Sequence, residues 1–185
     1  MKATDLPISY NAVDILERNL ATRANKIALL TPDREMTFGQ VSHEANQIGN
    51  ALKQLDVRAG ETVAILALDG AEWVAAYFGI LKIGGVAAGV NTLLKPHEHA
   101  FILKDCRARV LFVSKMLFPN LEQIRDQMPY VKHIIVIGGD SSSQLGAARV
   151  VPYSEFIKGQ SSELETAPTH RDDWATLNYS SGSTG

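Results

Sequence analysis

The sequence predicts an α/β protein in which a parallel or mixed sheet is flanked by helices. Two observations support this fold class. Short apolar runs alternate along the chain with segments whose apolar residues recur at helical spacing, and the connections between them are short. The apolar runs are also continuous, as is typical of strands that are covered on both faces of a sheet. We therefore expect one layer of strands between layers of helices.

The first third of the chain is expected to form a helix, a hairpin and a long amphipathic helix. Residues 11–21 carry apolar side chains at helical spacing, with Asn11 as a candidate N-cap. Residues 26–31 and 35–38 read as two strands that flank a turn. A long helix then begins at Thr37 or Gly39. Its expected inner face is Val41, Ala45, Ile48, Ala51, Leu52 and Leu55.

The remaining sequence alternates strands and helices. The expected strands are residues 62–68, 86–90, 108–113 and 133–138, and the expected helices are residues 71–83, 96–104 and 116–127. Residues 139–148 are rich in glycine and serine and predict an exposed loop. A short strand and helix over 149–158, a polar connector over 159–172 and a strand over 174–180 complete the chain.

Charge and composition limit the classes of function. The 185 residues carry 18 basic and 20 acidic side chains without a long run of one sign, which disfavours a nucleic-acid or anionic-membrane partner. We expect neither a signal peptide nor a spanning helix, because apolar runs are too short and interrupted. The single cysteine, Cys106, excludes an internal disulfide and fits a reducing cytoplasm.

The chain ends in "YSSGSTG", residues 179–185. Glycines let successive backbone N–H groups share one concave face, and hydroxyls add hydrogen-bond donors, so such a stretch suits an anion. Its glycine spacing does not match the GxxxxGK[ST] pattern of a P-loop. From composition alone, a polar tail is favoured over a phosphate-binding loop.

Three motifs in order change that interpretation. "DDWATLNYSSGSTG" (172–185) resembles the phosphate-loop signature of the adenylate-forming superfamily of acyl- and aryl-CoA synthetases, adenylation domains and luciferases. "MTFGQVSHEANQIGNAL" (36–52) and "ILKIGGVAAGVNTLL" (80–94) resemble two earlier segments of that superfamily. The resemblance spans essentially the whole chain. It implies that residues 1–185 are the N-terminal portion of an AMP-binding domain, truncated before the remainder.

Two further stretches resemble the benzoate-CoA ligase group within this superfamily. These are "VNTLL" (90–94) and "YNAVDILERNL" (10–20). The chain departs from the group at residues 87–89, which read Ala-Ala-Gly, and from the superfamily at Phe38 and Gln40. These departures are mild for the fold and leave the identity of the acid open.

The resemblance implies a two-step reaction. An aromatic carboxylate attacks the α-phosphate of MgATP, and coenzyme A then displaces AMP from the acyl-adenylate. The residues expected to hold the β- and γ-phosphates are Ser180, Ser181, Gly182, Ser183, Thr184 and Gly185. Thr184 is the hydroxyl expected to matter most, with Ser181 next. Mg²⁺ is expected to arrive with ATP, and Thr184 is the candidate contact for it.

The catalytic lysines of the superfamily are expected beyond Gly185, so no catalytic residue is assigned within the chain, which alone is expected to be inactive. Two other adenylate-forming functions stay open: a medium-chain acyl-CoA synthetase and an adenylation domain that loads a carrier protein. A third alternative is a folded, non-catalytic remnant that serves in binding or oligomerisation. A homo-oligomer is also left open.

Other conspicuous residues are expected to be structural. Cys106 lies near Arg107 and Arg109, which could lower the pKa of its thiol, but a buried structural role is favoured. His97 and His99 point to different faces of a helix and are expected to be solvated or capping. The aromatic pair Trp73 and Tyr77 is expected to pack on one helix face. The polar pair Asn91 and Thr92 is expected to cap a helix.

Overall fold

The computed structural model describes residues 5–180. The chain divides into two compact units. Among the described residues, the first contains 5–61, Asp69–Val86 and Ser154–Ala175, and the second contains Thr62–Leu68, Ala87–Tyr153 and 176–180. Each unit is formed by segments that are distant in the sequence, and each is described by itself below.

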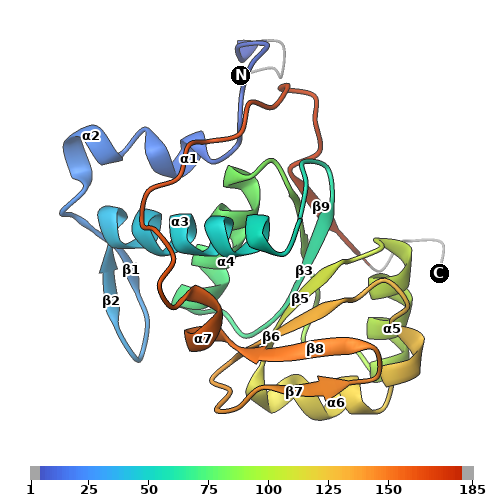
Figure 1. The fold of residues 1–185 in the computed structure, drawn as a ribbon. Coiled ribbons are helices and arrows are strands. Elements are labelled where there is room, and N and C mark those ends of the chain that lie inside the picture. The colour runs from blue at the N-terminus through green and yellow to red at the C-terminus, as the bar shows by residue number, and fades with distance from the viewer. Residues whose placement is uncertain (1–4, 181–185) are drawn as a thin grey trace. The chain divides into compact units, whose positions relative to one another are not determined.

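A seven-stranded sheet with the order β7-β8-β6-β5-β3-β4-β9 organises the second unit (Figure 1). Its strands are β3 (Thr62–Leu66), β4 (Val86–Gly89), β5 (Val110–Ser114), β6 (His133–Ile137), β7 (Ser143–Leu145), β8 (Ala148–Pro152) and β9 (Thr176–Asn178). The β3–β5, β5–β6, β6–β8 and β4–β9 pairs are parallel, and β7 runs antiparallel to β8. The expectation of a mixed sheet flanked by helices is confirmed.

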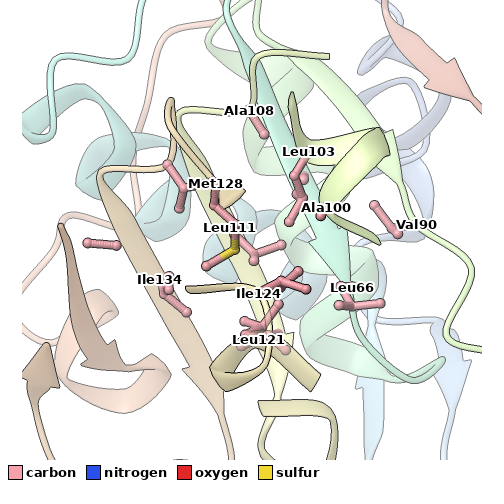
Figure 2. Close-up of a cluster of buried hydrophobic side chains, with 14 of the residues drawn as sticks. Leu66, Val90, Ala100, Leu103, Ala108, Leu111, Leu121, Ile124, Met128 and Ile134 are labelled. Carbon is pink, nitrogen blue, oxygen red and sulfur yellow. The ribbon is translucent and has the colours of Figure 1, made fainter. Parts of the chain in front are cut away.

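One face of this sheet is covered by α5 (Pro96–Asp105) and α6 (Phe118–Glu122). Figure 2 shows Leu111 and Ile134 of the sheet among side chains from these helices, including Leu103 and Leu121. All four are 0–1% exposed. Each such buried side chain stabilises the fold by about 1.5–3 kcal/mol relative to an exposed position. The apolar runs are continuous because the other face, with Ile65, Phe112 and Ile135, is also buried.

The first unit is built on α3 (Phe38–Gln54) and α4 (Ala71–Lys82). The predicted hairpin is present as β1 (Ile27–Leu30) and β2 (Glu35–Thr37), which pair antiparallel. Thr37 is the N-cap of α3: its hydroxyl accepts from the Gln40 N–H at 3.2 Å, and the Gln40 side chain accepts from the Thr37 N–H at 2.8 Å. This capping box explains why the helix begins here.

The polar connector between α7 (Tyr153–Ile157) and β9 lies along α3. Asn46 donates to the Ser162 carbonyl at 2.7 Å. Asn50 donates to the carbonyls of Ser161 and Glu163 at 2.9 and 3.0 Å. Amide side chains of one helix thus satisfy backbone oxygens of a segment that forms no helix or strand of its own.

The single helix predicted over residues 11–21 is wrong. The structure has two short helices, α1 (Asp14–Glu17) and α2 (Leu20–Arg23). Asn19 interrupts them, because its side-chain amide donates to the carbonyls of Ile15 and Leu16 and so competes with the backbone. Asn11 is not the N-cap of α1. Its Oδ1 accepts from the Val13 N–H at 2.9 Å, before the helix begins.

The helix predicted over residues 116–127 is also broken. It comprises a 3₁₀ turn at Lys115–Leu117, the short α6 and a second 3₁₀ turn at Arg125–Gln127. Pro119 has no N–H to donate to a preceding turn. The N–H groups of Ile124 and Gln127 bond three residues back, to Leu121 and Ile124. Such bonds define 3₁₀ rather than α geometry.

Within the loop predicted over residues 139–148, the structure places the three-residue strand β7. Leu145 pairs with Ala148 across a tight turn, and Gly146 adopts a φ of 57° there. Only Leu145 of this strand is buried. A short polar strand at a sheet edge lacks the apolar run by which the other strands are recognised.

None of the helices in the described part of the chain combines the length and the apolar character needed to cross a membrane.

Candidate functional site

The candidate site begins where β9 leaves the sheet. Ligands of open parallel sheets bind outside the carboxyl ends of the strands. Tyr179 and Ser180 follow the carboxyl end of β9, and Ser180 is exposed there. Of the predicted phosphate-binding residues, the structure therefore places Ser180. The other five lie outside the described residues: Ser181, Gly182, Ser183, Thr184 and Gly185.

The sheet fixes the strand that carries Ser180. β9 pairs with β4, with Gly89 opposite Asn178. The Thr176 hydroxyl donates to the Ala87 carbonyl at 2.9 Å. Leu177 packs against the core beneath. The carboxyl ends of β4 and β9 consequently lie side by side, so the chain leaves β4 next to the point where Tyr179 and Ser180 leave β9.

Tyr179 joins the end of β9 to the end of α5. Its hydroxyl donates to Oδ2 of Asp105 at 2.7 Å, and its ring packs against the core. Burial, followed by the hydrogen bond to Asp105, raises the pKa of the Tyr179 phenol. Like an ordinary tyrosine, the phenol is protonated at neutral pH, and the raised pKa extends this donor state further into the alkaline range.

Cys106 lies next to this contact and is buried, as expected. Burial raises the pKa of the Cys106 thiol, in spite of the nearby Arg107 and Arg109. The activation that the arginine residues would allow is thus not realised, and the buried structural role is confirmed.

At the amino end of the strands, burial is also the main cause that lowers the pKa of His133, the first residue of β6.

The loop after β4 is held from below by His99. The His99 ring is 0% exposed, and its Nε2 lies 3.0 Å from the Asn91 carbonyl oxygen. Because a carbonyl only accepts, this contact requires the proton on Nε2. The expectation of a solvated or capping His99 is wrong, since α5 turns this position towards the core. His97 is exposed, as expected.

Asn91 caps a turn and not the helix. Its Oδ1 accepts from the Leu93 N–H at 2.9 Å. The N-cap of α5 is Lys95, whose N–H donates to the Glu98 carboxylate at 2.8 Å. The predicted helix-capping role of Asn91 is therefore wrong. Thr92 is half-buried in the same turn.

Two polar contacts join the carboxyl ends of other strands. The Leu68 N–H, after β3, donates to the Ser114 hydroxyl of β5 at 3.0 Å. Lys115, after β5, forms an ion pair with Asp140, after β6. Among residues 5–180 there is no group of three His, Cys, Asp or Glu side chains that could hold a metal ion. The named polar groups at these strand ends thus bond to one another.

The aromatic pair lies in the first unit. The rings of Trp73 and Tyr77 stack with centroids 5.5 Å apart and an interplanar angle of 11°. Tyr77 also meets Phe78 edge to face, again with centroids 5.5 Å apart. The expectation that this pair packs is confirmed.

Sequence reasoning missed Asp105 as a site residue and assigned His99 the wrong role. One signal was present for Asp105. It is the last residue of α5, where a negative side chain opposes the helix dipole. A carboxylate at that position suggests a compensating partner. For His99, an i, i+2 pair on a helix that covers a sheet must place one member inward, and Ile102 and Leu103 mark the inward face.

Comparisons with known proteins agree on one family. The sequence profile described as "AMP-binding enzyme" matches residues 16–185. A 3-hydroxybenzoate–CoA/4-hydroxybenzoate–CoA ligase of Thauera aromatica is 32% identical over 179 residues, which cover 96% of this chain and 34% of that protein. A benzoate–CoA ligase of the same organism is 32% identical, and the match covers 99% of this chain and 34% of that protein.

Two solved structures are also similar. The anthranilate CoA ligase AuaEII, in complex with anthranoyl-AMP, matches with 58% identity and a TM-score of 0.92, and the match covers 100% of this chain and 35% of that one. A benzoate CoA ligase from Burkholderia xenovorans LB400 matches with 28% identity and a TM-score of 0.75. This match covers 90% of this chain and 32% of that one.

The chain spans about a third of the length of these relatives. Within that third, the profile match extends from α1 to the last residue of the chain. The mixed sheet is the fold of the N-terminal region in these structures. The chain therefore belongs to the AMP-binding enzyme family.

Proposed function

We propose that this chain is the N-terminal part of a cytoplasmic ligase that activates an aromatic carboxylic acid. The acid and ATP form an acyl-adenylate and pyrophosphate, and coenzyme A then takes the acyl group and releases AMP. The observation that carries this proposal is the 58% identity, over the entire chain, to a ligase whose structure holds an aryl-adenylate. The relatives at 32% identity, which are hydroxybenzoate and benzoate ligases, support the same class.

The residues assigned to ATP are those that follow β9. Ser180, Ser181, Gly182, Ser183, Thr184 and Gly185 would hold the β- and γ-phosphates. Backbone N–H groups and hydroxyls suit this task, because they stabilise negative charge on phosphate oxygens without a proton transfer. Mg²⁺ would neutralise part of that charge, and Thr184 is the candidate contact for it. The place of Ser180 at the carboxyl end of a parallel strand supports the assignment.

The proposed acid has a benzoate ring. The named substrates of the relatives above share a carboxyl group on an aromatic ring and differ in one substituent, hydroxyl, amino or none. We place anthranilate, 2-aminobenzoate, first among them because of the 58% identity to an anthranilate ligase. Benzoate and the two hydroxybenzoates follow.

The proposal is tested with a coupled assay of AMP release on the complete protein. The acids are anthranilate, benzoate, 3- and 4-hydroxybenzoate, octanoate and acetate, each with and without coenzyme A. We expect release of AMP that depends on coenzyme A and is fastest with an aromatic acid. Preference for octanoate would support a medium-chain synthetase instead. Turnover with a carrier protein but not with coenzyme A would support an adenylation domain, and no AMP with any acid would support a non-catalytic protein.

A further inference from the structure

The contact between Tyr179 and Asp105 lies at the base of the proposed phosphate loop. Tyr179 directly precedes Ser180, the first residue assigned to ATP. Its hydroxyl donates to Asp105 Oδ2 at 2.7 Å, across 74 positions in sequence. The ring of Tyr179 also packs against the core that underlies the sheet. The side chain thus anchors the chain at the point where it leaves the sheet.

β9 needs such an anchor because it is short. It has three residues and is the last strand of the described sheet, where β4 supports it on one side. Three parallel pairs, Ala87–Thr176, Ala88–Leu177 and Gly89–Asn178, are few for the strand that carries a ligand loop. An anion-binding loop is effective when its donors are held in position before the ligand arrives.

The location of Asp105 points to a specific role. It is the last residue of α5, where the negative end of the helix dipole disfavours a carboxylate. Asp105 is exposed, so its own packing does not require a carboxylate. The donor it binds is a tyrosine phenol, which is protonated at neutral pH, and burial and this hydrogen bond raise its pKa further.

We infer that Asp105 is a positioning residue for ATP: through the Tyr179 hydroxyl it fixes the start of the phosphate loop relative to α5. This inference rests on the proposed function, since it assumes that the loop binds ATP. In this role Asp105 acts through Tyr179 and not by its own contact with a substrate. Its effect is transmitted by one hydrogen bond, and loss of either partner has the same consequence.

The test uses four variants of the complete protein: Tyr179→Phe, Asp105→Ala, Asp105→Asn, and a double variant that combines Tyr179→Phe with Asp105→Ala. AMP release gives the KM for ATP, the KM for the acid and kcat. We expect Tyr179→Phe and Asp105→Ala each to raise the KM for ATP roughly tenfold, the effect of losing one hydrogen bond to a charged group. The KM for the acid should change less than about twofold. Asp105→Asn keeps an acceptor and should stay within about threefold of the wild type.

The double variant should be no worse than either single variant, because both remove the same bond. Tyr130→Phe and Asp126→Ala are matched controls, which remove an exposed tyrosine hydroxyl and an exposed carboxylate elsewhere in the same unit, and should leave all three parameters unchanged. A structural role alone would instead lower the melting temperature and impair every parameter together, with Asp105→Asn no better than Asp105→Ala. That pattern would overturn the inference.

The wild-type protein separates this inference from the proposed function. If the wild type releases AMP with an aromatic acid but Tyr179→Phe and Asp105→Ala keep its KM for ATP, the inference fails and the proposed function stands. If the wild type shows no ATP-dependent activity with any acid, both fail. Should Tyr179→Phe not fold, Asp105→Ala and Asp105→Asn decide, because they alter an exposed side chain at a helix end.

Discussion

Lys82 is a charged side chain that the fold buries, with 6% of the residue exposed. Its Nζ forms an ion pair with the Glu17 carboxylate. The Thr166 hydroxyl lies 3.0 Å from both oxygens of that carboxylate. Asn11 adds hydrogen bonds to the carbonyls of Leu81 and Ala167 at 2.9 and 3.1 Å. These polar contacts join the N-terminal segment, the end of α4 and the connector within the first unit.

Removal of Glu17 should therefore destabilise the protein. Glu17→Ala leaves the buried Lys82 ammonium without its ion-pair partner and should lower the free energy of unfolding by about 2–4 kcal/mol. Lys82→Met should lower the free energy of unfolding by less, because the Glu17 carboxylate is partly exposed and keeps its hydrogen bond from the Thr166 hydroxyl. Urea unfolding of the complete protein measures both. Equal stability of Glu17→Ala and the wild type would contradict the role of this pair.

Cys106 should react slowly at neutral pH and faster as the pH rises. Burial raises the pKa of its thiol above the ordinary value, so the reactive thiolate is scarcer at any given pH than in an unfolded chain. We expect iodoacetamide to label native Cys106 at least about tenfold more slowly at neutral pH than the urea-unfolded chain, with the rate rising into the alkaline range. Rapid labelling of the native protein at neutral pH would contradict the buried thiol.

At the scale of elements, α3 has two distinct faces with two partners. Its apolar face is the one that periodicity predicts, with Val41, Ala45, Ile48, Ala51 and Leu52 buried. Its amide side chains resemble an ordinary solvated face in the sequence. The structure shows that they bind the backbone of residues 160–163, over a hundred positions away. Periodicity predicts which face is apolar, but not what the polar face binds.

The amide contacts give a prediction about the connector. Asn50→Ala removes two hydrogen bonds to the carbonyls of Ser161 and Glu163, and should lower the free energy of unfolding by about 1–2 kcal/mol. Limited proteolysis should cleave the connector faster in this variant, because its backbone is less well held. Gln123→Ala is the control, since it removes one long amide contact to Pro119 on an exposed turn. Unchanged cleavage in Asn50→Ala would show that the amides do not hold the connector.

The packing of α3 on α4 gives a second prediction, which concerns whether Gly79→Ala stabilises or destabilises the protein. A Cβ at Gly79 would lie 2.8 Å from the Ala45 carbonyl oxygen and 2.9 Å from the Ile48 Cβ. Helix propensity alone predicts that Gly79→Ala stabilises the protein by about 1 kcal/mol. Because both helices would have to separate, we expect a loss of about 1–3 kcal/mol instead. Thermal unfolding distinguishes these outcomes, and a raised melting temperature would refute the close approach.

The elements that sequence patterns miss are those set by local competition or by edges. Asn19 and Pro119 interrupt segments whose apolar spacing is helical, because hydrogen bonding and a missing N–H override periodicity. β7 is recognisable only through its partner β8, since one of its three residues is buried. The strands with both faces covered, β3, β5 and β6, were all predicted, because burial on both sides leaves a plain apolar signature.

At the scale of the whole molecule, the candidate site also combines features that the sequence predicts with features that only the structure shows. Composition alone favours a polar tail for residues 179–185, and resemblance to a family assigns them to a phosphate loop. The structure adds what neither could supply. It places Ser180, the first residue of the proposed phosphate loop, at the carboxyl end of β9, beside β4, and links Tyr179 to a helix end 74 positions earlier. Contacts between such distant residues follow from the fold and not from local pattern.

The central claim is that the complete protein adenylates an aromatic acid by means of the loop that begins at Ser180. The most direct measurement is acid-dependent exchange of labelled pyrophosphate into ATP, which isolates the first step of the reaction. We predict exchange with anthranilate or benzoate, a loss of at least about tenfold in Thr184→Ala, and no loss in the exposed edge-strand control Ser143→Ala. Exchange that is faster with octanoate, that needs no acid, or that is unaffected by Thr184→Ala would contradict the account.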